Sequence, residues 1–339
     1  FGNNYFHHIE RLDDGQLVAF FGQTGWDPTV YLSTDDGLSW TPFSVNPASV
    51  LFDFDAEGPT LGAGCGVGFF TNAGSAGDLA PSNTGLNNAD IKALAAGDDW
   101  LWAGDGRGLW RSADGGNNWS FTSNDGQLNP TVQLLRRNDT LCALTQFSFL
   151  YSTDQGAQWT APFDGGPPGP FIPFPAKRMA LRGNQVLVGA DAVFLSDNFG
   201  ESWTAFNSAF AFEGISGVAF AGDQLFALAE ENDERGIVRS ADGGSNWELV
   251  YPLVGAGRME YFDGRLFAFT PAGMVYSDDL GDSWSVPLGL PDYSQEFNLP
   301  YTVKALVAHD TLLYAALDYL GIYKSGDGGD STHGFFTDP

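Results

Sequence analysis

Carboxylate side chains are the most abundant groups in this sequence that could do chemistry. The 339 residues include 42 Asp and Glu against 15 Lys and Arg, so the formal net charge is −27. Two suitably spaced carboxyl groups can hydrolyse a glycosidic bond, but with so many acids such a pair arises easily by chance. The four histidines, His7, His8, His309 and His333, lack the spacing of metal ligands. The sequence therefore predicts no metal site and singles out no catalytic residue.

A Ser and an Asp also recur in a fixed pattern, Ser-x-Asp-x-Gly-x-x-Trp. Six copies are present, one of them with Asn in place of Asp, and a seventh lacks the Trp. The motif residues are Ser33, Asp35, Gly37, Trp40, Ser112, Asp114, Gly116, Trp119, Ser152, Asp154, Gly156, Trp159, Ser196, Asn198, Gly200, Trp203, Ser240, Asp242, Gly244, Trp247, Ser277, Asp279, Gly281, Trp284, Ser325, Asp327 and Gly329. Asp accepts hydrogen bonds from nearby backbone N–H groups, Gly allows positive φ, and Trp offers a large ring for burial. We therefore expect these residues to be structural.

The spacing of the motif shows how many copies of it the sequence contains. The first two motif serines are 79 residues apart, whereas later neighbours are 37 to 48 residues apart. A hidden copy therefore lies between them, and Gly68–Gly74 keeps the apolar lead-in and a terminal Gly while losing the Asp and the Trp. Eight repeats of one short unit indicate a repeat architecture.

Each repeat contains four short apolar segments separated by turns, with the motif between the third and the fourth. This pattern predicts an all-β protein, a single β-propeller of eight four-stranded blades. The expected blades are residues 5–45, 46–86, 87–127, 128–170, 171–212, 213–252, 253–298 and 299–339. Seven blades with a detached terminal repeat fit almost as well. The sequence does not clearly assign the termini, Phe1–Asn4 and Ser331–Pro339, to a blade.

The motif series closely resembles the Asp-box, or BNR, repeat, and the resemblance covers nearly the whole chain. It implies that the motif turns are scaffold and lie on the face away from the usual active site. The family includes sialidases, xyloglucan-cleaving glycosidases, sortilin-like receptors, photosystem assembly factors and secreted bacterial proteins without known activity. Because the fold allows all of these functions, the function must be argued from a site.

Three of these functions find no match in the residues. A sialidase has an Arg-Ile-Pro segment near its start, which this sequence lacks. The xyloglucan-cleaving enzymes resemble two facing propellers, whereas this chain has repeats for one. The assembly factors use an arginine-rich patch, which an acidic chain does not provide. A glycoside hydrolase with carboxylates on the loop face remains the alternative to a non-catalytic protein.

Charge and composition limit the partners and the cellular location that we expect for this protein. A net charge of −27 repels nucleic acid and anionic membranes, and no apolar run is long enough to span a bilayer. Scarce Lys, and a sequence that begins at Phe1 without Met or a signal-like segment, suggest a processed, secreted protein. Cys65 and Cys142 fall on opposite strand faces of non-adjacent repeats, so we expect free, buried thiols.

The loops opposite the motif turns are where we expect a ligand to bind. They connect the second and third strands of a blade, and Trp26 beside Asp27 suits stacking on a sugar or a peptide, although packing on a neighbouring blade is as plausible. The candidate binding residues are Trp26, Asp27, Asp105, Arg107, Glu231, Asp233, Arg235, Asp318 and Tyr319. Glu230–Glu234 and Asp53–Gly58 are weak candidates for Ca²⁺, because both lack the spacing of a calcium loop, and we expect Asp53–Gly58 to be a solvated acidic turn.

The sequence thus predicts a secreted propeller without catalytic activity that acts as an extracellular binding or structural module. Its partner would be a glycan, a protein or copies of itself, through edge pairing or exchange of a terminal strand. No cofactor, nucleic acid partner or membrane insertion is expected.

Overall fold

Regular structure in this protein is entirely β within the residues that the computed structural model describes. These residues are 4–12, 15–23, 29–43, 51–57, 60–72, 79–86, 91–97, 100–122, 131–137, 140–145, 148–161, 178–190, 192–206, 214–231, 234–253, 258–262, 264–270, 273–287, 303–309, 312–317, 321–327, 330 and 333–336. No helix that could cross a membrane occurs among them.

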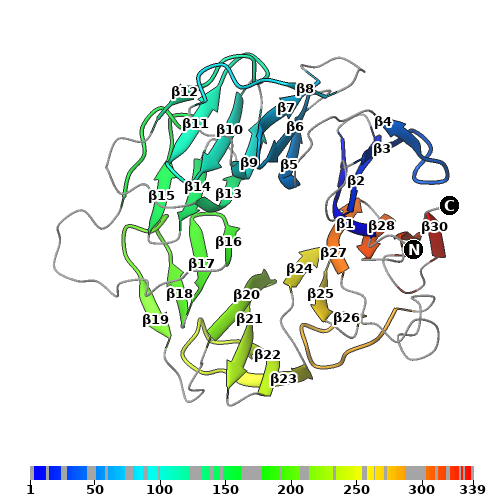
Figure 1. Cartoon of the computed structure of the whole chain (residues 1–339). Coiled ribbons are helices and arrows are strands. Elements are labelled where there is room, and N and C mark those ends of the chain that lie inside the picture. The colour runs from blue at the N-terminus through cyan, green and yellow to red at the C-terminus, as the bar shows by residue number, and fades with distance from the viewer. Residues whose placement is uncertain are drawn as a thin grey trace. The chain divides into compact units, whose positions relative to one another are not determined.

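The strands form eight antiparallel sheets, each from consecutive segments of the chain (Figure 1). Sheet 1 contains β1 (Asn4–Arg11), β2 (Leu17–Gln23), β3 (Thr29–Ser33) and β4 (Thr41–Phe43); sheet 2 contains β5 (Leu51–Glu57), β6 (Thr60–Cys65), β7 (Gly68–Thr71) and β8 (Ala80–Pro81); sheet 3 contains β9 (Ile91–Gly97), β10 (Trp100–Asp105), β11 (Leu109–Ser112) and β12 (Ser120–Phe121); sheet 4 contains β13 (Thr131–Arg137), β14 (Thr140–Thr145) and β15 (Phe149–Ser152).

The second half of the chain repeats this order. Sheet 5 contains β16 (Arg178–Arg182), β17 (Gln185–Gly189), β18 (Val193–Ser196) and β19 (Thr204–Phe206); sheet 6 contains β20 (Gly214–Ala221), β21 (Gln224–Glu231), β22 (Glu234–Ser240) and β23 (Glu248–Leu253); sheet 7 contains β24 (Arg258–Phe262), β25 (Arg265–Thr270) and β26 (Gly273–Ser277); sheet 8 contains β27 (Val303–His309), β28 (Leu312–Leu317), β29 (Gly321–Ser325) and β30 (His333–Phe336). Every motif serine ends the third strand of its sheet.

The chain divides into two compact units. The first comprises Phe1–Ala143, Ser152–Trp159 and Lys304–Pro339, and the second comprises Leu144–Tyr151 and Thr160–Val303. In the first unit β28 contacts β1, β1 contacts β5, and β5 contacts β9, so the last sheet in the sequence packs against the first. In the second unit β16 contacts β20 and β20 contacts β24.

Sheets 4 and 7 have three strands among the described residues, where we expected four. In the part of the chain that the structure describes, their fourth segments contribute single bridge pairs, Tyr151 with Thr160 and Tyr276 with Ser285. Pro287 lies two residues beyond Ser285, where the next ladder bond would need an N–H group that proline lacks. Pro162 has the same sequence position after Thr160. Proline thus explains the missing fourth strand in sheet 7.

Both termini reach further into the sheets than the sequence suggested. Asn4 begins β1, and His333–Phe336 forms β30, which pairs with β29 as the outer strand of sheet 8. The sequence assigned neither terminus clearly to a blade, and the structure places Asn4 in sheet 1 and His333–Phe336 in sheet 8. The number and the boundaries of the blades remain predictions.

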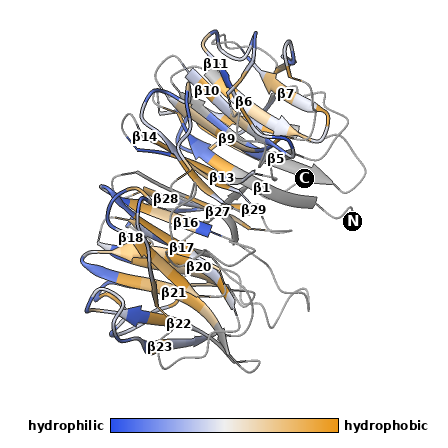
Figure 2. Ribbon diagram, turned by 90° about the vertical axis from the view of Figure 1, so that its left-hand side faces the viewer, coloured by the Kyte–Doolittle hydropathy of each residue, from blue (hydrophilic) through white to orange (hydrophobic). Residues whose placement is uncertain are grey.

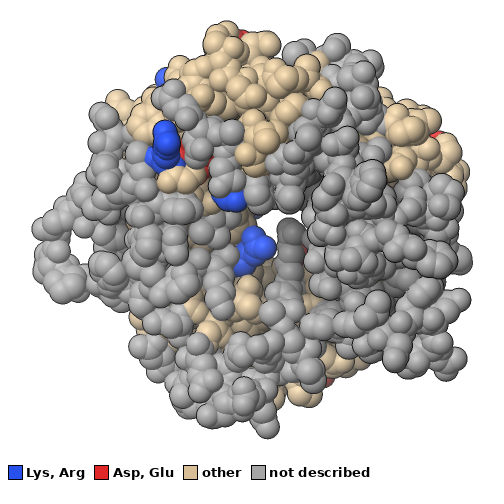
Figure 3. Space-filling model, in the orientation of Figure 1, with Lys and Arg blue, Asp and Glu red and all other residues tan. Residues whose placement is uncertain are grey.

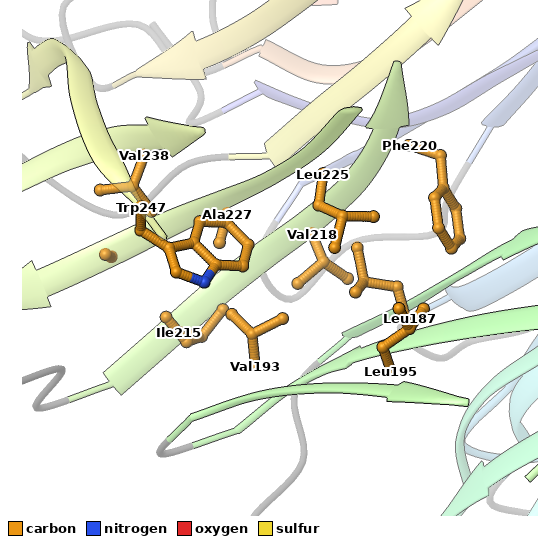
Figure 4. Close-up of a cluster of buried hydrophobic side chains, with 11 residues drawn as sticks. Leu187, Val193, Leu195, Ile215, Val218, Phe220, Leu225, Ala227, Val238 and Trp247 are labelled. Atoms are coloured by element: carbon orange, nitrogen blue, oxygen red, sulfur yellow. The ribbon is translucent and has the colours of Figure 1, made fainter. Parts of the chain in front are cut away.

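The core lies between successive sheets, because both faces of a sheet are covered. Strands such as β10 and β14 are therefore buried almost throughout rather than at alternate residues. In the second unit β20 and β21 are mostly hydrophobic (Figure 2). Side chains of sheets 5 and 6 meet in one cluster, where Trp247 lies with Ile215, Val193 and Ala227 (Figure 4).

The two thiols agree with their prediction. Cys65 and Cys142 are both free and buried, and burial raises the pKa of Cys142 to about 12. They pack as small apolar side chains.

We expect replacement of Trp247 by Ala to lower the free energy of unfolding by about 3–5 kcal/mol, because this buried ring fills the cluster between sheets 5 and 6. Leu249 in the same sheet is 50% exposed, so Leu249→Ala should change it by about 0.5 kcal/mol or less. Urea unfolding of both variants measures the difference. Equal losses would contradict this account of the core.

Candidate functional site

The motif turns, the segments from each motif serine to its tryptophan, are closed by their own side chains. In the first, the Ser33 hydroxyl donates to Asp35 Oδ1 at 2.8 Å and accepts from the Gly37 amide at 2.8 Å. The amide of Ser39 also donates to Asp35 Oδ1 at 2.8 Å. The serine and the aspartate thus satisfy backbone N–H groups that the turn would leave unpaired.

The other motif turns repeat this arrangement. The serine hydroxyl donates to the carboxylate or amide oxygen two residues on, at 2.5–3.0 Å, in these pairs: Ser112–Asp114, Ser152–Asp154, Ser196–Asn198, Ser240–Asp242, Ser277–Asp279 and Ser325–Asp327. The seven motif serines are 1–2% exposed, so none is placed to attack a substrate. Asn198 makes the same bonds as the aspartates, which shows that the turn needs an oxygen acceptor rather than a charge.

Hydrogen bonding keeps the motif aspartates ionised. The side-chain hydrogen bond from Ser283, together with the Ser283 amide, lowers the pKa of Asp279 to about 2. The pKa of Asp35 and that of Asp242 are lowered by the equivalent bonds from Ser39 and Asn246. A carboxylate held in this way is a poor proton donor at neutral pH, so these residues do not suit acid catalysis.

Three motif turns, those after Ser33, Ser152 and Ser277, also present a carbonyl to a side chain of the preceding sheet. Asp36 and Gln155, which precede the motif glycine, have φ of 55° and 58°. Lys324 Nζ and the Tyr314 hydroxyl donate to the Asp36 carbonyl at 2.8 and 3.2 Å, and Trp102 Nε1 donates to that of Gln155 at 2.9 Å. We call this contact the carbonyl latch.

The carbonyl latch occurs in both units. In the second, Arg239 Nη1 donates to the carbonyl of Leu280, whose φ is 57°, at 2.8 Å. In the first, it joins sheet 8 to sheet 1 through Lys324 and Tyr314. The first and last repeats are therefore joined by the same kind of contact as consecutive repeats.

The predicted loop candidates are only partly described. Asp105 is buried, and its Oδ1 accepts from the amides of Arg107 and Gly108 at 2.6 and 2.7 Å. It closes the turn between β10 and β11, which leaves the exposed Arg107 as the ligand candidate of that turn. Glu231 ends β21 and Arg235 lies in β22.

Each unit contains one pair of the described candidates. Asp105 and Arg107 share one turn of the first unit, whereas Glu231 and Arg235 share one hairpin of the second. The remaining candidates, Trp26, Asp27, Asp233, Asp318 and Tyr319, lie outside the described residues.

The sequence reasoning missed a group of carboxyl side chains in the first unit. Glu10 lies on β1, and Asp53 and Asp55 lie on β5. Asp53 Oδ2 accepts from the Leu94 amide and Asp55 Oδ2 from the Ala96 amide, each at 2.6 Å, and Glu10 is hydrogen-bonded to Asp55. We call these three residues the carboxyl group set.

Its members differ from a solvated acidic turn, which was our prediction for Asp53–Gly58. Asp53 and Asp55 are partly buried in a strand. Their side chains accept amides of β9 on the side of that strand that does not pair with β10. Their alternation at positions 53 and 55, which places both on one strand face, was the signal in the sequence. Burial, together with the charge of Asp53, raises the pKa of Glu10 to about 8, although the bond to Asp55 opposes this.

Among the described residues no group of three or more His, Cys, Asp or Glu side chains is placed to hold a metal ion. In particular, the carboxyl group set uses Oδ2 of both aspartates to accept backbone amides.

Comparison with known proteins identifies the fold. No family model matches the sequence, and no curated protein matches it. The structure is similar to the computationally designed Ika8 protein, with 12% identity, 97% of this chain and 96% of that chain covered, and a TM-score of 0.66. It is also similar to an ancestral GH74 enzyme, with 15% identity, 98% and 54% covered and a TM-score of 0.57. The fold is a β-propeller.

A third similar structure comes from outside the cell. It is the extracellular domain of a putative hybrid two component system from B. thetaiotaomicron, with 10% identity, 98% of this chain and 52% of that chain covered, and a TM-score of 0.56. The propeller neighbours thus include an enzyme and an extracellular domain. At these identities they establish the fold and leave the activity to the site.

We expect Ser240→Ala to lower the free energy of unfolding by about 1–3 kcal/mol, because the buried amide of Gly244 loses its acceptor. Asp242→Asn keeps an oxygen in place, as Asn198 does, and should cost about 0.5 kcal/mol or less. Urea unfolding compares the two. A larger loss for Asp242→Asn would mean that the turn depends on the charge.

We expect the double change Tyr314→Phe and Lys324→Met to weaken the joint between sheets 8 and 1 by about 1 kcal/mol, because the Asp36 carbonyl loses both donors. Hydrogen exchange should become faster in β1 and β28 and stay unchanged in β20 and β21. Arg137→Met, at an exposed position of β13, is the control. Unchanged exchange in β1 would show that the latch adds nothing to this joint.

Proposed function

We propose that this protein is a secreted, non-catalytic propeller that binds a glycan or a protein outside the cell. The proposal rests on the contrast between the two ends of the sheets. The motif ends share one hydrogen-bonded turn, whereas the opposite ends differ from sheet to sheet, so the opposite ends are where a specific ligand can be recognised. The turn geometry also supports the proposed relationship to Asp-box propellers and a count of eight blades.

The hairpin of β21 and β22 is the best-supported candidate for ligand binding on this surface. It continues to the pair Glu231–Glu234, six residues before Ser240, whereas the hairpin of β25 and β26 ends at Gly273, four residues before Ser277. The longer hairpin carries acidic residues and Arg235 near its tip. Acidic residues followed by Arg235 offer both acceptors and a donor for hydrogen bonding to a polar ligand.

The chemistry of the carboxyl groups supports a non-catalytic role. Glycosidases hold their two carboxyl groups about 5–9.5 Å apart so that the bond or a water fits between them. Asp53 Oδ2 and Asp55 Oδ2 each accept a backbone amide of β9 at 2.6 Å, so this group does not present two free carboxylates to a glycosidic bond. A glycoside hydrolase with other carboxylates on the loop face remains the alternative.

The net charge of the protein indicates which class of ligand it can bind. The net charge is −27, and on the described part of the face in Figure 3, Lys and Arg form small separate patches. Such a surface favours neutral or cationic ligands over polyanions. A second copy of the chain carries the same charge, and β30 already fills the outer place of its sheet, so ligand binding is better supported than exchange of a terminal strand.

A glycan array run with a parallel hydrolysis assay tests this function. We expect binding to a subset of neutral or cationic glycans, or to an extracellular protein in a pull-down, with no hydrolysis product. Glu231→Ala with Arg235→Ala should weaken binding about tenfold or more, whereas Ser245→Ala in the motif turn of the same sheet should not. A hydrolysis product would overturn the non-catalytic assignment, and a large polymer in size-exclusion chromatography would favour self-assembly.

A further inference from the structure

Asn118, in the motif turn of sheet 3, begins the sequence Asn118-Trp119-Ser120, in which a hydroxyl residue follows two positions after an asparagine. Asn-x-Ser or Asn-x-Thr, with any residue but proline at x, is the acceptor sequence for an N-linked glycan. The sequence has one further copy, Asn138-Asp139-Thr140, whose asparagine lies outside the described residues. A sequence this short arises often by chance, so the structure around Asn118 decides whether it can serve as an acceptor.

The two side chains that the transfer needs face solvent. Asn118 and Ser120 are exposed, whereas Trp119 between them is buried. The Trp119 ring packs edge-to-face on Phe69, and its Nε1 donates to the Ser82 carbonyl at 3.0 Å. Because successive residues of an extended chain point to opposite sides, the buried ring directs both of its neighbours outward. The asparagine and its hydroxyl partner therefore lie on the same, solvent-facing side.

The side-chain amide of Asn118 can be substituted without breaking the motif turn. Its Nδ2 donates to Asp114 Oδ2 at 2.7 Å, and the Asn118 backbone amide donates to Asp114 Oδ1 at 2.8 Å. A carboxamide nitrogen carries two N–H groups, and a glycosylated one keeps a single N–H. The bond to Asp114 is therefore compatible with a glycan that projects into solvent.

Sheet 6 contains a matched turn without the hydroxyl residue. Asn246 donates from its backbone amide to Asp242 Oδ1 at 2.9 Å and from Nδ2 to Asp242 Oδ2 at 2.6 Å, the same two bonds as in the turn of sheet 3. It is exposed and precedes the buried Trp247. Glu248 follows, however, so this turn lacks the acceptor sequence. The two turns thus share their hydrogen bonds and differ at the position that the acceptor sequence requires.

We propose that Asn118 is the acceptor of an N-linked glycan on the motif turn of sheet 3. In this reaction Nδ2 forms a bond to the anomeric carbon of a lipid-linked oligosaccharide. The bond from that carbon to the lipid pyrophosphate breaks, the pyrophosphate keeps the electron pair, and Nδ2 releases one proton to solvent. The inference rests on the proposed secretion of the protein, because such acceptors lie on the surface of secreted chains.

A glycan at Asn118 places a hydrophilic group beside an outer strand that contains no proline. That strand is β12, whereas β4, β8 and β23 each contain a proline, which removes one backbone donor from the strand. Phe121 of β12 is 44% exposed and packs edge-to-face on Trp110, with ring centroids 4.9 Å apart. Edge strands with exposed apolar side chains can pair with other chains, and a bulky, solubilising glycan opposes such pairing.

Translation of the full chain behind a cleavable export leader, in the presence of microsomes from the endoplasmic reticulum, tests the proposal. We expect the chains protected from added protease to carry a glycan that an endoglycosidase removes, and release by an amidase to leave Asp at position 118. Ser120→Ala keeps both bonds of Asn118 to Asp114 and should abolish the modification at this site, whereas Asn138→Gln should leave it in place. Protected chains with an unmodified Asn118 would overturn the proposal.

Glu248→Ser gives sheet 6 the same acceptor sequence and is the matched control. Asn246 should stay unmodified in the wild type and become modified in this variant, because its turn already has the hydrogen bonds of the sheet 3 turn. Modification of Asn246 in the variant without modification of Asn118 would also count against the proposal. The ligand-binding assay of the proposed function uses the unmodified protein, so its failure would bear on that function alone.

Discussion

The hydrogen bond from the motif glycine to the motif serine underlies both the repeat and the packing of one repeat on the next. It closes the turn with the residue before the glycine in the left-handed region, as φ of 55° at Asp36 and 84° at Gly37 shows. That conformation aims the Asp36 carbonyl at Lys324 and Tyr314 of another sheet. One local bond therefore fixes a hairpin and a long-range joint together, and glycine is needed at the close approach: a Cβ at Gly116 would lie 2.3 Å from Phe69.

Several described carboxylates serve this structure as acceptors for backbone amides. Asp35, Asp55 and Asp105 each accept at least one backbone amide. An acidic chain with 15 Lys and Arg cannot pair every carboxylate with a cation, and backbone N–H groups are the donors available in quantity. Because an amide does not cancel the charge, these bonds stabilise the folded chain while the negative field remains.

The fold was readable from the sequence because its determinants are local. A motif repeated at nearly constant spacing fixes the hairpin between the third and fourth strands, and even the copy near Thr71, without Asp or Trp, forms its strand β7. The missing fourth strand of sheet 7 was not predicted, although Pro287 was visible, because the consequence of a proline depends on the strand register. The carboxyl group set was missed for a related reason. Glu10 and Asp55 are 45 positions apart in the sequence, and only the stacking of sheet 1 on sheet 2 brings them together.

The candidate binding residues show the limit of local reasoning most clearly. Asp105 was chosen as a polar residue in a loop, yet its carboxylate is buried and closes its own turn. An aspartate followed by Gly, Arg and Gly has the composition of a turn that an Asx side chain stabilises, so one of its oxygens, Oδ1, is used within the turn, whereas Oδ2 is buried without a partner. A ligand residue must have hydrogen-bonding capacity left after the backbone has been satisfied. In this protein the carboxylates of the motif turns and of the first strands accept backbone amides. The side chains that still have hydrogen-bonding capacity for a ligand are then those at the hairpin ends that differ between sheets, where Arg107 is exposed.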